Sequence, residues 1–323
     1  MQTVLKLCIT MTAALGLASA STRAQTWPAK PVRIVIPYAP GGTADTWGRI
    51  LAEGLTDSLK VQVFADNKPG GGGLVGSAEV ARAAPDGHTL VISGIGSHVI
   101  APAINPSVTF EPMKDFTHIA MLGGPPNVFI ANPKTGIKTL EDWIGFVKKA
   151  AKPAGYGSPG VGSNGHLFGE WFRQKTAISM EHIPYRGAAL AVTDIIAGHV
   201  PLGSVTVTTA AAHIRSGAVT AIAVSSAGRL ASFPEIPTFK ELGHDITATT
   251  WFSLSGPKGM AADIVNRLNS EVVTVIGAAK VKERLDRDAI LFQPMSPAEF
   301  TRTMAEEITR WGTIAKAAGV KPE

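Results

Sequence analysis

Short runs of branched apolar residues alternate with longer stretches in which apolar positions recur every three or four residues. The runs predict buried β-strands, and the periodic stretches predict helices. In the first part of the chain we expect strands at 32–36, 61–65 and 89–93 and helices at 44–58 and 74–83. Strand–helix alternation of this kind favours a parallel, doubly wound sheet.

The middle of the chain repeats the alternation. Thr139 is expected to cap a helix whose first turn holds Glu141 and Asp142. An irregular surface loop is expected at 234–238. The expected strands are 127–131, 155–158, 182–185, an irregular 200–207 and 221–224, and the expected helices are 139–150, 166–175 and 188–198.

After Trp251 the pattern returns to a strand at 252–255, followed by helices at 261–275, 278–288 and 297–318. Because no long linker interrupts the chain, we expect two α/β lobes joined by crossings near residues 125 and 250. Lobe 1 is expected to hold 25–125 plus 250–323, and lobe 2 to hold 126–249. Discontinuous lobes of this kind suit a clamshell that closes about a hinge.

The first two dozen residues predict a secretory signal peptide. Lys6 precedes an apolar stretch at 7–17, and small residues follow at 18–20 and 22–24. We expect cleavage after Ala24, which would leave a secreted mature chain that begins at Gln25. The only cysteine lies in this segment, so the mature chain would hold no disulfide, thiol nucleophile or cysteine-ligated metal.

Composition excludes several classes of protein. Of 323 residues, 45% are hydrophobic and 17% charged, and apolar runs beyond the N-terminus are interrupted by charge, Gly or Pro. This argues against disorder and against membrane-spanning helices. Loss of Lys6 and Arg23 lowers the net charge from +5 to +3, with no Lys/Arg cluster that would bind nucleic acid. No spacing of histidines predicts a metal site, and we expect no cofactor.

A glycine-rich loop at 40–45 follows the first strand and opens a helix. Ligands bind at the carboxyl ends of strands in open α/β sheets, and backbone N–H groups at a helix N-terminus attract anions. Gly41, Gly42, Thr43 and Asp45 are therefore candidate binding residues. The alternative is an ordinary turn in which Thr43 caps the helix.

Residues 71–76 match G-x-G-x-x-G, but the motif follows the second strand and no acidic residue stands at the expected strand end. We therefore favour a flexible connection over a dinucleotide site.

A second candidate anion site lies at 157–166, where Ser158, Ser163, Asn164 and His166 precede or open a helix. It would face the first if both lobes share a cleft. The residue two before Ser163 is valine, so the nucleophile-elbow motif is missed. A secreted serine hydrolase that uses Ser163 and His166 remains the enzymatic alternative.

Three further groups of residues are candidates with structural alternatives. Ser97 and His98 follow the third strand, where they would bind a carboxylate or bond to backbone. Tyr185, Arg186 and Gly187 end a strand, where the arginine would pair with an acidic ligand or with a neighbouring carboxylate. Trp251 and Phe252 stand at the second crossing, where they would line a cleft or pack at the hinge.

Several motifs occur together in a characteristic order across the mature chain. They are Trp27-Pro28-Ala29-Lys30-Pro31-Val32-Arg33-Ile34-Val35, Pro40-Gly41-Gly42-Thr43-Ala44-Asp45, Asn67-Lys68-Pro69-Gly70 with Gly73, Ala84-Pro85-Asp86-Gly87, Lys114-Asp115-Phe116, Asn132-Pro133, Gly157-Ser158, His182-Ile183-Pro184-Tyr185, Pro234-Glu235-Ile236-Pro237-Thr238 and Leu268-Asn269. Together they resemble the Bug-type receptors, the periplasmic substrate-binding components of tripartite tricarboxylate transporters.

The resemblance implies a monomeric, two-lobed periplasmic binding protein, each lobe a mainly parallel sheet flanked by helices. It would close on a small organic carboxylate and deliver it to the membrane subunits of the transporter. In such receptors a helix N-terminus of the second lobe holds a ligand carboxylate, and the loop after the first strand contacts it partly through water. Carried over by motif, one wall would hold Gly41, Gly42 and Thr43, with Asp45 bracing the loop, and Ser97 and His98 beside them. The other wall would hold Ser158, Ser163, Asn164 and His166, with Tyr185, Arg186, Gly187 and Thr206 nearby.

One departure from the family pattern bears on the ligand. Family members commonly carry acidic residues after Gly-Gln-Val, whereas Gly198-His199-Val200 is followed here by Pro201, and Val205-Thr206 stand at the second acidic position. We therefore expect a carboxylate without an amino group, either a dicarboxylate or an aromatic acid suited to Trp251 and Phe252. A sensory receptor for the same ligands is a further alternative.

Overall fold

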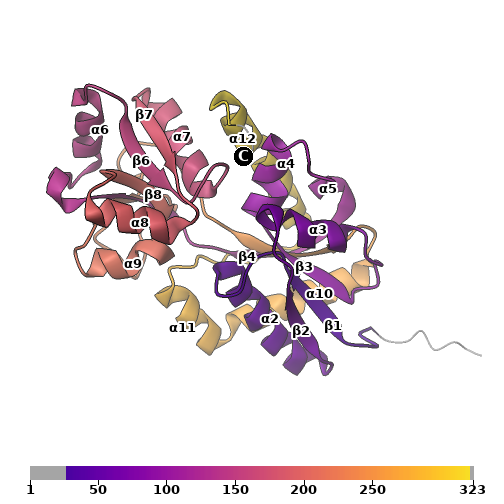
Figure 1. Cartoon of the computed structure of the whole chain (residues 1–323). Helices are drawn as coiled ribbons and strands as arrows, with labels where there is room; N and C mark the ends of the chain where they lie inside the picture. The colour runs from indigo at the N-terminus through magenta and orange to yellow at the C-terminus, as the bar shows by residue number, and fades with distance from the viewer. Residues whose placement is uncertain (1–26, 321–323) are drawn as a thin grey trace, which may run out of the picture.

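Two five-stranded sheets organise the computed structural model, which describes residues 27–320. The expected signal peptide lies outside the described residues. One sheet has the strand order β2-β1-β3-β10-β4 and the other β7-β6-β8-β5-β9. We call the parts of the molecule built around them the first and second lobes, which lie side by side in Figure 1.

The strands of the first lobe are β1 (Val32–Ile36), β2 (Val63–Asn67), β3 (Thr89–Gly94), β4 (Phe116–Gly123) and β10 (Phe252–Pro257). Those of the second lobe are β5 (Asn127–Ala131), β6 (Ala154–Ser158), β7 (Met180–Pro184), β8 (Leu202–Thr206) and β9 (Thr220–Val224). These two sheets with their flanking helices confirm the expected two-lobed α/β fold.

Helices cover both sheets. The first lobe has α2 (Thr43–Leu59), η1 (Gly71–Gly73), α3 (Leu74–Ala81), η2 (Gly96–Ile100), α4 (Ala101–Ile104), α5 (Pro112–Asp115), α10 (Ala262–Gly277) and α11 (Ala279–Arg287). The second lobe has η3 (Pro133–Thr135), α6 (Leu140–Lys149), α7 (Asn164–Thr176), α8 (Ala188–Ala197) and α9 (Val207–Arg215), and α12 (Pro297–Ala317) stands between the lobes (Figure 1).

Each sheet contains one strand that runs against the other four. β10 is antiparallel to β3 and β4, and β5 is antiparallel to β8 and β9. Each reversed strand is the first strand after the chain has crossed from the other lobe. It begins where the forward strands end, since Asn127 pairs with Thr206 and Phe252 with Gly94. The carboxyl ends of the forward strands therefore meet at the crossings, and each sheet is mainly parallel, as expected, with one reversed strand.

Several element boundaries differ from those expected. β2 begins and ends two residues later than the strand expected at 61–65. Its polar end is stabilised by partners outside the strand, because Asp66 pairs with Arg33 and the Asn67 amide donates to the Tyr38 carbonyl. The irregular strand expected at 200–207 is the shorter β8, and the helix α9 that follows was not predicted. Neither β4 nor the helical segment at 96–104 was predicted. The capping box at Thr139 is present as expected.

Two glycines allow the crossings to lie against each other. Gly124 exchanges two backbone hydrogen bonds of 3.1 Å with Leu291, and the Thr250 N–H donates to the Pro125 carbonyl at 2.8 Å. A Cβ atom on Gly123 would collide with the Leu291 carbonyl oxygen, and one on Gly124 with that of Thr250. The second crossing therefore excludes a side chain at Gly124, and the segment between α11 and α12 excludes one at Gly123.

The last helix joins the cores of the two lobes. Phe300 and Trp311 of α12 are fully buried in a cluster that also holds Phe129 and Phe168 of the second lobe. Trp311 meets Trp171 of α7 edge to face, with 5.8 Å between ring centroids. The largest apolar cluster of the described chain is therefore continuous across the lobes.

Glu307 of α12 is buried at the hinge and satisfied by three donors. Its Oε2 accepts from the indole N–H groups of Trp251 and Trp311, at 3.0 and 2.9 Å, and its Oε1 accepts from Arg310. The indole of Trp251 at the second crossing is thereby fixed to α12. Within residues 27–320, no helix has the length and apolar character needed to span a membrane.

Replacing Gly124 by alanine should destabilise the protein by about 2–4 kcal/mol, because the added methyl group meets a backbone carbonyl that cannot rotate away. Gly145 in α6 is the matched control, since nothing lies within 4 Å of a Cβ there. Gly145→Ala should be neutral or stabilising by up to about 1 kcal/mol. Urea denaturation measures both, and equal stability of Gly124→Ala and the parent would contradict the steric argument.

Candidate functional site

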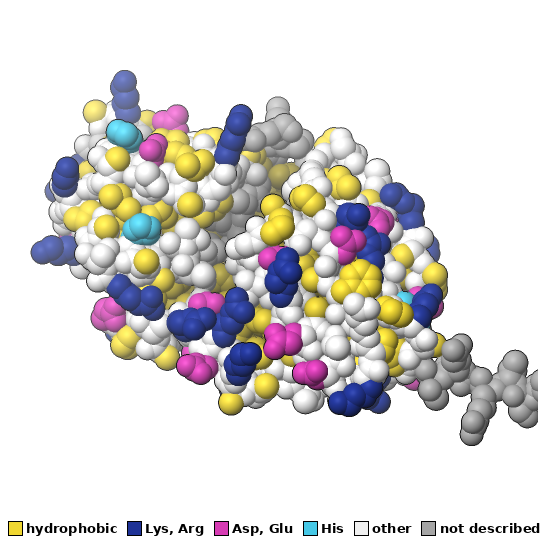
Figure 2. Space-filling view, turned by 60° about the horizontal axis from the view of Figure 1, so that its bottom comes forward, with side chains coloured by type: hydrophobic (Ala, Val, Ile, Leu, Met, Phe, Trp, Pro, Cys, Tyr) yellow, Lys and Arg dark blue, Asp and Glu magenta, His cyan; other side chains and the backbone are white. Residues whose placement is uncertain are grey.

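A cavity of about 350 Å³ lies between the lobes at the carboxyl ends of their strands. Its walls come from four segments that are distant in sequence. They are Tyr38 after β1, the glycine-rich turn with Gly71, Gly72 and Leu74, the η2–α4 segment with Gly96, Ile100, Ala101, Ile104 and Asn105, and the loop before α7 with Pro159, Gly160, Val161, Gly162 and Ser163. Figure 2 shows the furrow between the two lobes, with cationic and acidic side chains interspersed beside it.

The first-lobe wall depends on close packing of a glycine turn against Tyr38. Gly73 has a φ of +99°, and a Cβ atom there would lie 2.9 Å from the Tyr38 ring and 3.0 Å from Ser97 Cβ. This turn belongs to the G-x-G-x-x-G segment. Its glycines therefore serve close packing and the cavity wall, rather than a flexible connection alone.

Asp45 braces the loop that follows β1. Its carboxylate accepts from the Gly41 N–H and the Arg49 guanidinium, both at 3.0 Å, and from the Asn67 amide at 3.0 Å. The guanidinium, assisted by the other two donors, lowers the pKa of Asp45 to about 2. The side chain is 8% exposed and both of its oxygens accept hydrogen bonds, so it fixes the loop conformation.

The second-lobe wall is a loop that ends in a capped helix N-terminus. Ser163 is the N-cap of α7, and its Oγ accepts from the His166 N–H at 3.2 Å. Capping leaves the N–H groups of Asn164 and Gly165 without acceptors inside the helix. A Cβ on Gly165 would collide with the Ser204 carbonyl oxygen, so this helix end packs directly on β8.

Two stacked imidazoles support the loop from below. His166 of α7 and His182 of β7 lie 3.6 Å apart with their planes inclined by 10°. His166 Nδ1 accepts from the Gly162 N–H at 3.1 Å, and His182 Nε2 lies 2.6 Å from Ser158 Oγ. Burial lowers the pKa of His166 to about 4. Burial, aided by the His166 ring, lowers the pKa of His182 to about 3. Both rings are therefore neutral near pH 7, and each is hydrogen-bonded to the loop or to the end of the strand that precedes it.

Unpaired polar atoms gather beneath the N-terminus of α7. The Asn127 amide donates to Asn164 Oδ1. Asn127 Oδ1, Asn164 Nδ2 and Ser204 Oγ have no hydrogen-bond partner among the described residues, and all three side chains are at least nine-tenths buried. Unpaired buried polar groups are costly, so this cluster favours a polar guest at the helix end.

The description "tripartite tricarboxylate transporter family receptor" belongs to a family model that matches residues 48–320. The chain belongs to this receptor family. The resemblance to Bug-type receptors is therefore confirmed.

Individual relatives cover nearly the whole receptor. Protein BugT of Bordetella pertussis is 32% identical over 311 residues, which cover 96% of this chain and 95% of BugT. A protein of R. palustris solved with adipate superposes with a TM-score of 0.81 at 28% identity, over 92% of this chain and all of the other. MatC from Rhodopseudomonas palustris, solved with malate, gives 0.75 at 28% identity over 89% and 99% of the two chains.

The receptor brings only part of the expected set to the cavity. Ser163 lines it, and Ser158, Asn164 and His166 support the loop or the helix end. Gly41, Gly42 and Thr43 stand at the same edge of the first sheet but do not line the cavity. Gly42 rather than Thr43 is the N-cap position of α2, and it has no side chain to bond the helix end.

Four of the expected residues form hydrogen bonds or packing contacts with other parts of the protein. Ser97 is fully buried, with its Oγ 3.0 Å from His98 Nδ1. His98 packs between Phe110 and Phe116, and burial lowers its pKa to about 3, so it is a neutral core histidine. Trp251 bonds Glu307, and Phe252 packs edge to face on Tyr38 with 6.3 Å between centroids.

The remaining candidates flank the second lobe. Tyr185 donates to Asp194 at 2.8 Å. Burial, reinforced by this carboxylate, raises the pKa of Tyr185 to about 12. Arg186 is exposed and forms no ion pair within residues 27–320. Gly187 is the N-cap position of α8, and Thr206 is that of α9, with its Oγ1 3.1 Å from Thr209. Val205 is buried beneath α8 and α9, so an acid at that position would not reach the cavity.

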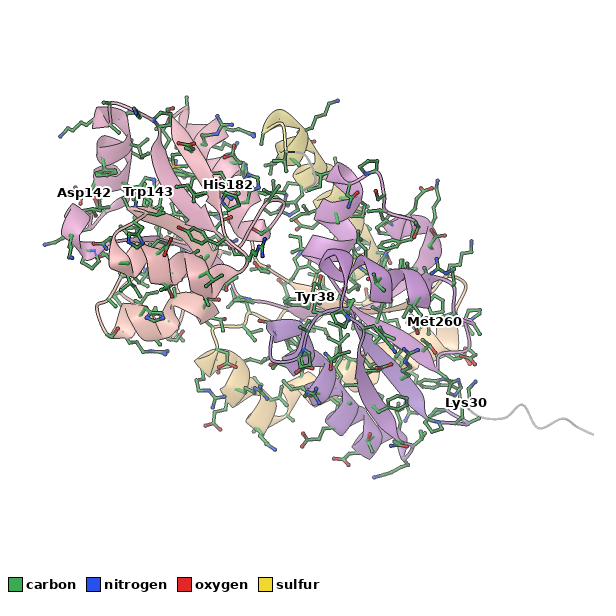
Figure 3. The ribbon with its side chains drawn as sticks, viewed as in Figure 1. Lys30, Tyr38, Asp142, Trp143, His182 and Met260 are labelled. Atoms are coloured by element: carbon green, nitrogen blue, oxygen red, sulfur yellow. The ribbon has the colours of Figure 1, made fainter. Side chains whose placement is uncertain are left out.

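Most residues of the cavity wall were not among the binding residues expected from the sequence. Tyr38, Ile100 and Ile104 gave no signal beyond apolar patterning, and His182 was quoted only as part of a motif. Figure 3 labels one missed residue from each lobe, Tyr38 and His182. The available signal was positional: Tyr38, the Gly70–Gly73 turn and η2 follow β1, β2 and β3, whose carboxyl ends share one edge.

Acid should destabilise the protein through the stacked histidines. Their pKa values are lower in the folded state than the ordinary 6.5, so unfolded chains bind more protons and stability falls as pH drops from about 6.5 toward 4. Between pH 7 and pH 5 the free energy of unfolding should therefore decrease in both proteins. The decrease should be about 1–2 kcal/mol smaller for His182→Gln than for the parent. His213→Gln, at the end of α9, is the control and should follow the parent. Urea titrations at both pH values that gave parallel losses for parent and His182→Gln would contradict the assignment.

Proposed function

We propose that this receptor binds a small organic carboxylate between its lobes, with the carboxylate at the N-terminus of α7. The observation that carries the proposal is the unpaired Asn164 amide, at least nine-tenths buried beside two free backbone N–H groups. These donors belong to the two residues that follow Ser163, which lines the cavity. A carboxylate supplies the acceptors that this group lacks, and the helix dipole adds to its attraction.

Closure of the lobes would complete the site. The cavity needs both walls, and a Cβ on Gly162 of the second lobe would lie 2.7 Å from Ile104 of the first. A ligand that contacts both walls binds the closed form more tightly than the open form and shifts the population toward it. Capture of the anion and hinge closure are therefore one coupled event.

The solved relatives support a carboxylate ligand, because one was solved with adipate and another with malate. The family description supports delivery of the ligand to the membrane subunits of a tripartite transporter. A monomer in the periplasm, exported by the N-terminal signal peptide, is consistent with that role. A sensory receptor for the same ligand is the alternative. Loss of ligand uptake in cells that lack the receptor would favour the transport role, and unchanged uptake would favour the sensory role.

The serine hydrolase alternative receives less support from the local geometry. Ser163 Oγ accepts the His166 N–H as a helix cap, while the His166 ring accepts from Gly162. Glu170 bonds Tyr156 and Arg173. To activate Ser163, His166 or Glu170 would first have to give up these hydrogen bonds and form one with the Ser163 hydroxyl. Turnover of activated esters that is lost in Ser163→Ala would favour the hydrolase.

Asn164→Asp should weaken carboxylate binding by at least tenfold with little loss of helix stability. An acidic residue in the first turn of a helix is compatible with its dipole, but it repels a bound anion in a buried site. Asn266→Asp adds the same charge on exposed α10 and is the matched control. Calorimetric titration with acids released from the purified protein and identified by mass spectrometry measures the effect. Unchanged affinity in Asn164→Asp would contradict the proposed anion position.

The mature protein recovered from the periplasm should begin at Gln25. Cleavage after Ala24 follows from the small residues at 22–24 behind the apolar stretch. N-terminal sequencing checks this, and recovery of an intact N-terminus from the cytoplasm would contradict both export and the expected processing site.

A further inference from the structure

We propose that the hinge carries a second binding site, which takes a flat aromatic monoanion and holds the two lobes in the arrangement described above. A cavity of about 450 Å³ lies beside the crossings, and we call it the hinge pocket. Its lining comes from the end of β4, the segments 247–251 and 291–295 and one face of α12, with Ala227 at the edge. Among residues 27–320 it shares no lining residue with the ligand cavity, the one that Ser163 lines. The hinge pocket therefore goes beyond the proposed function and does not depend on it.

One wall of the hinge pocket is a short stretch of the second crossing that is fixed at both ends. The Ala248 N–H donates to the Ser225 carbonyl at 2.9 Å, and its carbonyl accepts from the Ser225 hydroxyl at 2.6 Å, which fixes it to the second lobe. The Trp251 carbonyl accepts from the Ile95 N–H of the first lobe at 3.2 Å, and its indole donates to Glu307 of α12. Only two residues of the crossing lie between these anchors.

The two anchors make the width of the hinge pocket depend on how the lobes are placed. Any rotation of one lobe on the other moves Ala248 relative to Trp251, and both residues line the pocket. In the same arrangement the lobes meet across the ligand cavity, where a Cβ on Gly162 would lie 2.7 Å from Ile104. A guest that fills the hinge pocket at this width binds this arrangement most tightly and shifts the population toward it. Occupancy of the hinge pocket is therefore coupled to contact between the walls of the ligand cavity.

The apolar side of the hinge pocket fits a flat aromatic body. It is formed by the rings of Trp251 and Phe292 and by the thioether side chains of Met121 and Met295. Aromatic rings and thioethers both make favourable contacts with an aromatic guest, and methionine adapts its shape to it. At the edge of the pocket, Leu291 is 39% exposed, which is unusual for a large apolar side chain of this protein. The volume of the pocket lies in the range of small-molecule sites.

The charged groups of the hinge pocket favour an anion. Within residues 27–320 they are Glu307 and Arg310. The Glu307 carboxylate is buried, and its charge is balanced by two indole N–H groups and the guanidinium. Arg310 Nη1 lies 2.9 Å from Glu307 Oε1, while the side chain is 42% exposed and has further N–H groups to donate. A sulfonate or carboxylate on the guest pairs with this guanidinium at the edge of the pocket, where it keeps part of its hydration.

Two fluorescent probes of the same shape test the site. Anilinonaphthalene sulfonate joins flat aromatic rings to one anionic group, and N-phenylnaphthylamine is the same molecule without the sulfonate. Arg310→Gln should weaken binding of the sulfonate by about fivefold or more, because a charge-assisted hydrogen bond is lost, and binding of the neutral probe by less than about twofold. Arg302→Gln removes the same charge from an exposed position of α12 and should change neither affinity. Fluorescence titration measures each dissociation constant.

A variant that fills the hinge pocket separates it from the ligand cavity. Ala227 is exposed at the edge of the pocket, so a larger side chain there does not disturb the core. Ala227→Phe should weaken binding of both probes by about fivefold or more, because it takes the place of apolar surface that they bury. Asn164→Asp, at the ligand cavity, should leave both affinities unchanged. Sulfonate binding that neither Arg310→Gln nor Ala227→Phe weakens, or no saturable binding at all, would overturn the inference.

Distances between the lobes test the coupling. The only cysteine of the sequence lies at position 8, in the expected signal peptide, so cysteines introduced at the exposed Ser107 and Thr193 carry one spin label on each lobe. Saturating sulfonate probe should narrow the distribution of distances measured by pulsed electron paramagnetic resonance, and Ala227→Phe should abolish the narrowing. A distribution that the probe leaves unchanged would overturn the coupling. None of these experiments uses a carboxylate, so their failure would leave the proposed function standing.

Discussion

The arrangement of both lobes depends on the contact between their two crossings. The first crossing leaves β4 through two glycines, and the second enters β10 directly beside it, with backbone hydrogen bonds between the segments. Because side chains are excluded there, the crossings approach to backbone distance and set where each reversed strand begins. The forward strands of both sheets then end at the same place. The cleft follows from this geometry, since every loop after a forward strand opens toward the other lobe.

The two walls of the cleft are stiffened by different chemistry. In the first lobe an ionised carboxylate, Asp45, gathers three donors, and its charge is held by Arg49. In the second lobe two uncharged imidazoles, His166 and His182, form hydrogen bonds with Gly162 and Ser158. The rings themselves therefore add no charge beneath the loop before α7.

Sequence patterning predicted the elements whose signal is local. The buried strands at 32–36 and 127–131 match the structure, and Thr139 caps its helix as expected. Patterning failed where tertiary contacts determine where an element begins or ends. β2 extends into Asp66 and Asn67 because partners elsewhere satisfy them, and α9 follows β8 without a turn signal. The site divides in the same way. The loop at 158–166 carries its polar residues in sequence, whereas Ile104 and Tyr38 matter only because the fold sets them opposite the glycine loop.

The position of α12 at the end of the described chain has a consequence for how the protein acquires its structure. Phe300, Met304 and Trp311 fill a core whose other members begin two hundred residues earlier. During synthesis, that core stays open until residues 297–317 have left the ribosome, and Trp171 of α7 until then lacks the Trp311 ring that it meets edge to face. The two lobes thus reach their final packing only after residues 297–317 have been made.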